Sequence, residues 1–383
     1  MLLDKITKVA KDLDKPNLNS SFSEKDCKLI LNDIGNKVEE IDSELATRLY
    51  LLGVSHTNML TSEYKLSEEY YEYFYDYLKK NTKRVAEYIA ILSEKIIQSK
   101  SKDVILVSVA YTGTLTGVLI KRYVQLTYGI NLHHYSISML RDLGPDENAI
   151  VYIINKHQSA NIQFIDSWLD NGYLIQSLKD FCLNFYKKYN VLLDSTFGVI
   201  SDPSHFTKLY GTREDFLLPS SMVNHHSNGL ISCTISRNDL VTPLGYHFAK
   251  YRKDLETNDL SYMIINSITI YFDYLNKCDI AIDEIEEKKH PSTSEIHYIK
   301  LEYNIRNKEN IQVGINTATL LLMNMPPKYI IAKDLTDKSL EHILYLAKER
   351  NIPVYENKKL HYNCVSIIER EENLFLVNNR NLI

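Results

Sequence analysis

An alternation of strand-like and helix-like segments between residues 104 and 200 constrains the fold of this chain more than any other feature. Val104 to Ala110 is a continuous apolar run of strand length, as expected for a strand that is buried on both faces of a parallel sheet. Further strand-like segments alternate with helical patterns, the strands at His133–Met139, Ile162–Ile165, Val191–Leu193 and Phe197–Ile200 and the helices at Leu115–Leu126, Glu147–Gln158 and Leu174–Tyr189. This spacing predicts an α/β domain with a doubly wound, mainly parallel sheet.

The loops that follow these strands carry polar side chains. Asp166 directly follows Ile162–Ile165, and Asp170, Asn171 and Gly172 form the turn before the next helix. Open α/β sheets bind ligands beyond the carboxyl ends of their strands, helix starts can hold phosphate, and carboxylates can bind sugar hydroxyls or a metal. These residues alone leave open a simpler interpretation, in which an Asp or Asn only caps the helix. We expect three loops to meet at one cleft: Tyr111–Thr114, Arg141 and residues 166–172.

The flanking regions follow other patterns. Residues 1–100 are predicted to be mostly helical, with a capping box before a helix at Cys27–Ile34 and a long helix at Ser67–Ile97. Residues 279–297 are charged, contain Pro291 and lack an apolar face, as is typical of a linker. Residues 298–383 return to short strand and helix patterns and end in a strand-like run at Leu374–Val377. They predict a small α/β sandwich.

Composition excludes several classes of protein. The net charge of −5 argues against a chain that coats nucleic acid regardless of sequence. The five cysteines form no CxxC pair, which favours reduced thiols in the cytoplasm. The amino-terminal residues lack the apolar core of a signal peptide, and no apolar run reaches the length of a membrane span. We therefore expect a cytoplasmic protein without membrane contacts, and an oligomer is compatible with the sequence.

Two polar clusters between residues 202 and 260 are candidates for chemical sites. His225 and His226 are adjacent, so they do not readily point at one ion, and no spacing fixes a third ligand; we predict no metal site there. Cys233 with a nearby histidine could act as a nucleophile and its base, although no spacing specifies such a pair.

Several sequence blocks, in the right order and covering about residues 17–275, resemble one family. They are Val107–Arg122, His134–Arg141, Phe164–Trp168, Thr212–Ser220 and Asn224–Ser232, together with His56, His247 and Lys250. The resemblance is to the phosphoribosyltransferase-like family found with bacterial tellurite-resistance and stress gene clusters, which also carries the cysteine-protease label StiP. It implies a phosphoribosyltransferase-like domain at 101–278 and transfer of a phosphoribosyl group from phosphoribosyl pyrophosphate with Mg²⁺ as the cofactor.

The resemblance also implies roles for individual residues. Asp166 would hold the ribose hydroxyls, and Arg213 would bind anionic oxygens, as guanidinium groups do well. Glu214 or Asp215 would hold Mg²⁺ or act as an acid or base. The substrate-binding residues would be Tyr111, Thr112, Gly113 and Thr114 as the pyrophosphate loop, with Arg141, Asp170, Asn171, Gly172 and Asn224.

Departures from the family pattern keep other interpretations open. The loop after Trp168 reads Leu-Asp-Asn-Gly where the family has Thr-Gly-Lys-Gly, so Asp170 places a carboxylate where a phosphate would sit. Tyr111, Leu143 and Cys233 stand where basic residues are expected. These losses of positive charge fit a ligand with fewer phosphates, or a degenerate protein that only binds a nucleotide or RNA. A cysteine hydrolase, as the family label suggests, is the third alternative.

The carboxyl-terminal residues resemble a second family, the Pelota-type RNA-binding domains. Gly314-Ile-Asn316-Thr-Ala-Thr319 is similar to the G-x-N-E-x-T motif of kink-turn RNA readers, with Thr317 in place of the glutamate. A strand from Ile330 leading to Lys333 follows in the expected order. The resemblance implies that structured RNA is bound by Gly314, Asn316, Thr317, Thr319 and Lys333, mainly through shape.

Overall fold

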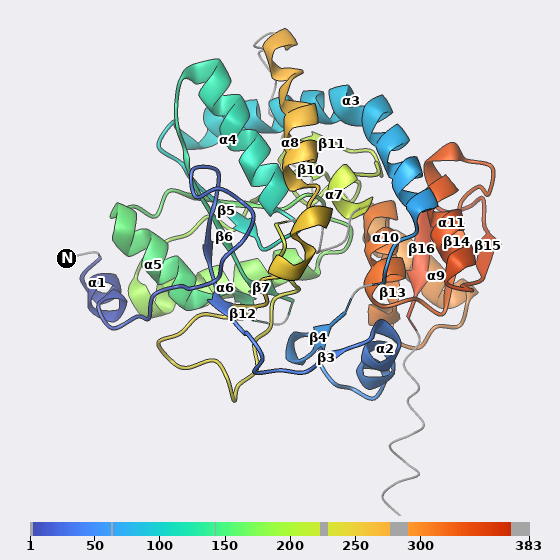
Figure 1. The fold of residues 1–383 in the computed structure, drawn as a ribbon, viewed down its shortest axis with the longest axis horizontal. Helices are drawn as coiled ribbons and strands as arrows, with labels where there is room; N and C mark the ends of the chain where they lie inside the picture. Colours follow the sequence, from blue (N-terminus) through green and yellow to red (C-terminus); the bar gives the residue numbers. More distant parts are fainter. Residues whose placement is uncertain (1–2, 63, 142, 223–228, 276–289, 369–383) are drawn as a thin grey trace, which may run out of the picture.

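The computed structural model describes residues 3–62, 64–141, 143–222, 229–275 and 290–368 (Figure 1). Within these residues, six strands form one parallel sheet in the order β1-β6-β5-β9-β10-β11. Their bounds are Lys28–Ile30 (β1), Ile105–Val109 (β5), His133–Ile137 (β6), Ile162–Ile165 (β9), Phe197–Ser201 (β10) and Leu209–Thr212 (β11). The prediction of a mainly parallel α/β sheet is confirmed.

The strand order reverses between β5 and β9. From β5 the chain moves to β6 on one side, then crosses to β9 on the other side and continues outward to β10 and β11. The helices that follow β5 and β9, α4 and α6, therefore lie on opposite faces of the sheet, and the ends of these two strands are where sheets of this kind bind ligands.

Helices cover both faces of this sheet (Figure 1). One face packs against α3 (Glu68–Lys100), α4 (Thr114–Tyr128) and α8 (Ser261–Thr269). The other packs against α1 (Asp4–Ala10), α5 (Glu147–His157) and α6 (Tyr173–Tyr189). Side chains alternate along β5, so that Leu106 joins the first apolar cluster while Ile105 and Val107 join the second. Burial on both faces explains why β5 reads as an unbroken apolar run.

The remaining short elements of this region connect and cover the sheet. They are α2 (Ser43–Leu51), α7 (Pro219–Met222), β2 (Asn32–Asp33), β3 (Glu40–Ile41), β4 (Leu60–Thr61), β7 (Met139–Leu140), β8 (Gly144–Pro145) and β12 (Phe248–Ala249).

The carboxyl-terminal unit is a smaller α/β layer structure. Within the described residues, its sheet has the order β13-β16-β14-β15, and α10 and α11 pack on one face while α9 packs on the other. The bounds are Ile311–Val313 (β13), Tyr329–Ala332 (β14), Val354–Glu356 (β15), Cys364–Ile367 (β16), Pro291–Glu302 (α9), Ile315–Asn324 (α10) and Glu341–Glu349 (α11). The apolar side chains of α10 and α11 belong to the same cluster as those of α3 and α7. The two units therefore share one core.

Three local predictions are corrected by the structure. Cys27–Ile34 is not a helix, because Lys28–Ile30 pairs with β6 as the edge strand of the main sheet, so the amino-terminal region is only partly helical. Val191–Leu193 is not a strand. Pro291 opens helix α9 inside the predicted linker, since proline suits the first helical position. Residues 279–289 and the strand predicted at Leu374–Val377 lie outside the described residues.

Within the described ranges, no helix is both long enough and apolar enough to span a membrane.

Candidate functional site

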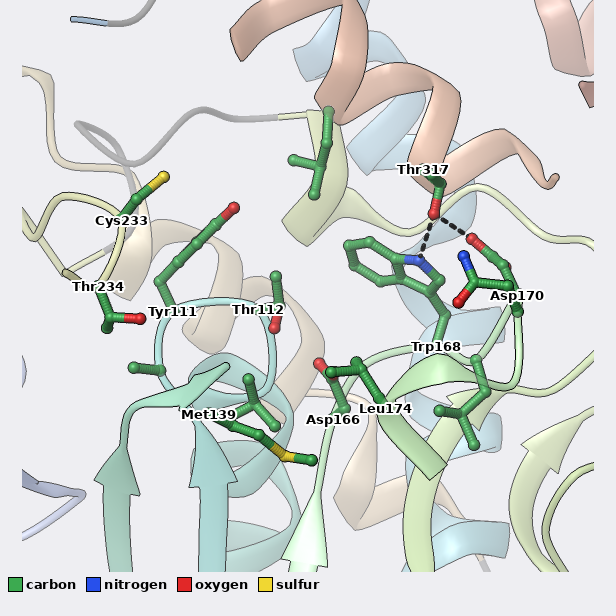
Figure 2. Close-up of a pocket in the computed structure, with 15 residues that line it drawn as sticks. Tyr111, Thr112, Met139, Asp166, Trp168, Asp170, Leu174, Cys233, Thr234 and Thr317 are labelled. Atoms are coloured by element: carbon green, nitrogen blue, oxygen red, sulfur yellow. Dashed lines mark hydrogen bonds between the residues drawn. The ribbon is translucent and has the colours of Figure 1, made fainter. Parts of the chain in front are cut away.

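A pocket lies at the carboxyl ends of β5 and β9, at the point where the strand order reverses (Figure 2). Its cavity volume is about 290 Å³. We call it the switch-point pocket; its lining residues are Val109, Ala110, Tyr111, Thr112, Met139, Asp166, Trp168, Leu169, Asp170, Asn171, Leu174, Cys233, Thr234, Thr317 and Leu320. Figure 2 shows Tyr111 and Cys233 on one side, Trp168, Asp170 and Thr317 on the other, and Asp166 between them.

The loop after β5 packs closely on the end of β9. A Cβ at Gly113 would overlap the Ile165 carbonyl oxygen and lie 2.9 Å from the Asp166 Cα, so only glycine allows this approach. Ser167 Oγ donates to the Thr112 carbonyl at 2.5 Å and ties the two loops together. Tyr111 has a φ of 51°, a left-handed conformation that is uncommon for a residue with a side chain. Packing between the ends of β5 and β9 holds the backbone of Tyr111 in this conformation.

Asp166 is the ionisable group at the base of the pocket. Its side chain is 4% exposed, and burial raises its pKa from 3.8 to about 7. Hydrogen bonds from Thr112 and from the Ser167 N–H, at 2.8 Å, oppose this rise because they favour the carboxylate. A carboxyl group with this pKa exchanges protons near neutral pH, which is the range a general acid or base requires.

The opposite wall joins the two units of the chain. The Trp168 indole N–H donates to Thr317 Oγ1 at 3.2 Å, and Thr317 in turn donates to Asp170 Oδ2. Burial, followed by the nearby Asp215 carboxylate, raises the pKa of Asp170 well above its ordinary value. Asp170 Oδ1 is buried and has no hydrogen-bond partner within the described residues. Such an atom carries an energetic penalty that a ligand donor could relieve.

Cys233 lies on the same side of the pocket as Tyr111, and a hydrogen bond joins their side chains. Burial raises the pKa of the Cys233 thiol to about 12, although hydrogen bonds from its own backbone and from Tyr111 oppose the shift. The thiol is therefore protonated at neutral pH. A catalytic cysteine is usually a thiolate stabilised by a nearby cation. His225 and His226 lie outside the described residues.

The pocket lining contains carboxylates and no Lys or Arg within the described residues. The nearest predicted cation, Arg141, follows β7, and its guanidinium lies 3.7 Å from the centre of the Tyr173 ring. Its Nη2 atom is buried without a hydrogen-bond partner in the described part of the chain. Tyr173 directly precedes the pocket-lining Leu174 in the sequence, but Arg141 itself does not line the pocket. The pocket thus suits sugar hydroxyls and aromatic bases better than a polyanion.

The structure gathers five of the predicted substrate and catalytic residues at the pocket, namely Tyr111, Thr112, Asp166, Asp170 and Asn171. Gly113, Thr114 and Gly172 shape the backbone around it. Thr114 is fully buried at the start of α4 and bonds Ser136 Oγ at 2.8 Å, and Gly172 packs on Phe206. Asn224 lies outside the described residues.

Arg213, Glu214 and Asp215 do not line the switch-point pocket. They line a separate hollow with Pro203, His361, Tyr362 and Asn363 at the junction of the two units. Arg213 pairs with the fully buried Asp202, and the exposed Glu214 pairs with Arg84. The resemblance assigned these residues catalytic roles together with Asp166, but the structure places them in a different hollow from Asp166, where Asp215 contacts the start of α10.

The residues predicted to bind RNA are mostly enclosed. Asn316 and Thr319 are fully buried, and Gly314 and Thr317 contact Asp170 of the main unit. Lys333, which follows β14, is exposed. In the docked arrangement, RNA can reach Lys333 but not Asn316.

Sequence reasoning missed the contribution of Trp168, Thr317 and Leu320 to one wall. Trp168 was part of a family block but had no assigned role. Thr317 and Leu320 lie about 150 residues further along the chain. Asp170 and Thr317 each differ from the residue expected in their family, and in the structure these two side chains contact each other. No spacing within the sequence could reveal this contact.

Fold and pocket together define an α/β protein with a ligand-sized cavity at a sheet switch point, closed by a second α/β unit. Residues 20–269 match the family model described as tellurite-like stress resistance cysteine protease StiP, and residues 290–370 match the PELOTA RNA binding domain. The first match covers more than half of the chain, which therefore belongs to the StiP family.

One curated relative is the protein named "Cysteine protease StiP" from Acinetobacter baylyi. It is 23% identical over 350 residues, covering 87% of this chain and 90% of the relative. No solved structure matches the chain.

Proposed function

We propose that the protein binds a ribose-containing, nucleotide-like ligand in the switch-point pocket and makes or breaks the bond at its anomeric carbon. It would act as a phosphoribosyltransferase-like enzyme of a cytoplasmic stress-resistance system. The observation that carries the proposal is Asp166, a buried carboxyl with a pKa of about 7 at the tip of β9. The family match to stress-resistance proteins supports the setting.

The proposed reaction uses the pocket residues in separate roles. The bond between the anomeric carbon and the leaving group breaks, and its electron pair departs with the leaving group. Ionised Asp166 would accept hydrogen bonds from the ribose hydroxyls and favour the positive charge that develops on the sugar ring. The acceptor nitrogen, or water, forms the new bond, and Asp166 would then take up the proton that the acceptor loses.

The charges of the pocket support a ligand with few phosphates. Ionised Asp166 would repel a polyanion, whereas Arg141, whose Nη2 has no hydrogen-bond partner in the described residues, would bind one phosphate. Trp168 and Tyr111 provide aromatic surface for a base or ring. No cluster of three or more His, Cys, Asp or Glu in the described ranges is arranged to hold a metal. With phosphoribosyl pyrophosphate as the ligand, the diphosphate would carry Mg²⁺, which would neutralise its charge.

Isothermal titration of the full chain tests this proposal. Phosphoribosyl pyrophosphate with and without Mg²⁺, ribose 5-phosphate and AMP would be titrated into the protein and into Asp166→Asn. We expect binding of at least one of these ligands, weakened about tenfold or more, roughly 1.4 kcal/mol, by the substitution. Asp180→Asn, an exposed carboxyl on α6, is the matched control. Equal affinity of Asp166→Asn and the unmodified chain would contradict the proposal.

A cysteine hydrolase is the second candidate, because Cys233 lines the same pocket and the relative from Acinetobacter baylyi is named a cysteine protease. Cleavage of a fluorescent casein would be compared among the unmodified chain, Cys233→Ser and Asp166→Asn. Activity that is lost in Cys233→Ser alone would favour the hydrolase over ribosyl chemistry.

We also propose that the carboxyl-terminal unit binds structured RNA. The match of residues 290–370 to the PELOTA RNA binding domain supports this role, and the exposed Lys333 would contact phosphate. Fluorescence anisotropy with a labelled kink-turn RNA, and with a DNA duplex as control, measures it.

A further inference from the structure

The first turn of α10 is held by carboxylates of the main unit. We call Gly314–Thr319 the α10 start. The N–H of Ile315 donates to Asp215 Oδ1 at 3.0 Å, and the Asn363 N–H donates to the other oxygen of Asp215 at 2.9 Å. Thr317 Oγ1 donates to Asp170 Oδ2. Two carboxyl groups from the main unit thus occupy a helix start whose N–H groups favour anions.

The side chain of Asp170 also comes close to the backbone of the α10 start. Gly314 has a φ of 95°, and a Cβ there would lie 2.7 Å from Asp170 Oδ1. That oxygen is buried, faces the α10 start and has no hydrogen-bond partner in the described residues. Only one oxygen of Asp170 therefore accepts a hydrogen bond at the α10 start. A ligand that forms more hydrogen bonds with the α10 start could replace Asp170 there.

Asn316 makes contacts of the kind that read a base edge. Its Oδ1 accepts from the Leu218 N–H and from Ser221 Oγ, both at 2.8 Å, while its Nδ2 donates to the Phe216 carbonyl at 2.8 Å. The peptide edge at 216–218 therefore presents one acceptor and one donor side by side. Side-chain amides pair with the same arrangement on nucleobases.

We propose that Asp170 and residues 215–221 act as an intramolecular mimic of RNA, so that RNA and the main unit compete for the α10 start. The inference rests on the proposed RNA binding of the carboxyl-terminal unit, and not on the chemistry at Asp166. The carboxylates take the place of phosphates, and the peptide edge takes the place of a base.

Competition would also control the switch-point pocket. Thr317 and Leu320 form part of its wall, and Thr317 holds both Trp168 and Asp170. Release of the α10 start to RNA removes this wall and exposes Trp168 to water. A ligand held in the closed pocket would then bind more weakly, and by linkage it would weaken RNA binding by the same factor.

Trp168 allows a direct test, because it is the only tryptophan of the chain and lies at the contact with Thr317. Indole emission of the full chain, excited at the red edge of the absorption band where tyrosine does not absorb, would be followed during titration with a kink-turn RNA. We expect a red shift and greater quenching by acrylamide that saturate together with RNA anisotropy. A DNA duplex of the same sequence should cause no shift.

Two different variants test the competition, so that the result does not depend on a single substitution. Thr317→Glu places a third carboxylate against Asp170, and Asp215→Asn removes charge from the α10 start while keeping its shape. Each should bind RNA about tenfold more tightly than the unmodified chain, roughly 1.4 kcal/mol, and Thr317→Glu should be red-shifted before RNA is added. Thr293→Glu, an exposed site in α9, is the matched control and should match the unmodified chain. Circular dichroism would verify that each variant is folded.

The possible failures are distinguishable. RNA binding without a change in Trp168 emission, and without tighter binding by either variant, would overturn the competition but leave RNA binding intact. Absence of RNA binding in the unmodified chain and in both variants would overturn the competition together with the RNA-binding proposal. Neither result bears on ligand titration at Asp166.

Discussion

Asp166→Asn should make the protein more stable at neutral and alkaline pH while it weakens ligand binding. Folding raises the pKa of Asp166 from 3.8 to about 7, because the buried carboxylate is poorly solvated. The folded state therefore holds this proton more tightly than the unfolded chain does. The stability that this gives is complete below pH 4 and is lost as the pH rises to about 7.

The size of the effect follows from the shift. A change of about three pKa units corresponds to about 4 kcal/mol between pH 4 and pH 8, as an upper bound for one buried group. Asparagine cannot ionise, and its amide oxygen can still accept the Ser167 N–H bond. In the variant, the contacts of the second carboxyl oxygen of Asp166 are lost, which lowers the free energy of unfolding by about 1 kcal/mol at every pH. The variant should thus gain as much as about 3 kcal/mol at pH 8, gain less than about 1 kcal/mol at pH 5, and lose slightly only below about pH 4.5.

Urea unfolding of both proteins at several pH values between 5 and 8 measures this difference. Asp170 and Asp215 also have raised pKa values, and they contribute the same downward slope to both proteins. The difference between the two curves therefore isolates Asp166, apart from a small change in the Asp170 pKa when its neighbour loses charge. Parallel curves across this range would refute the reasoning, because they would mean that Asp166 is ionised in the folded protein. A gain in stability with a loss of binding is typical of functional residues.

Three further predictions concern the surroundings of the pocket. Gly113→Ala should lower the free energy of unfolding by about 2 kcal/mol, because the added Cβ overlaps the Ile165 carbonyl; unchanged urea unfolding would show that the two strand ends are not packed together. Asp202→Asn should cost about 3 kcal/mol, because it leaves the Arg213 guanidinium beside a buried neutral group, and a loss below about 1 kcal/mol in thermal unfolding would contradict this pairing. The Cys233 thiol should react slowly with iodoacetamide at pH 7 and faster as the pH rises, since its pKa is raised to about 12; rapid alkylation at pH 7, detected by mass spectrometry against Cys233→Ser, would instead reveal an activated thiolate.

Local sequence pattern was sufficient for the inner strands of the main sheet. The run at Val104–Ala110 and the strand at Ile162–Ile165 were placed correctly, because strands buried on both faces are apolar throughout and are bounded by turns. Helices α3 and α5 followed from their apolar periodicity in the same way. Asp166 was found because it ends such a strand.

The amino-terminal strand could not be found this way. Lys28–Ile30 is short, and its apolar residues fit a helix turn as well as a strand. Its partner β6 begins more than 100 residues later, at His133. Pairing with a distant strand, and not local preference, decides its conformation.

The sequence by itself therefore determined the inner strands of the parallel sheet and the acid at the end of one of them. Only the tertiary structure decided which residues share the pocket and what state they are in. The raised pKa of Asp166 depends on how many distant side chains exclude water from it. The contact of Asp170 with Thr317 joins residues that are 147 positions apart. Both are properties of packing across the fold, and packing is set by the sum of weak contacts among all elements, which no single stretch of sequence contains.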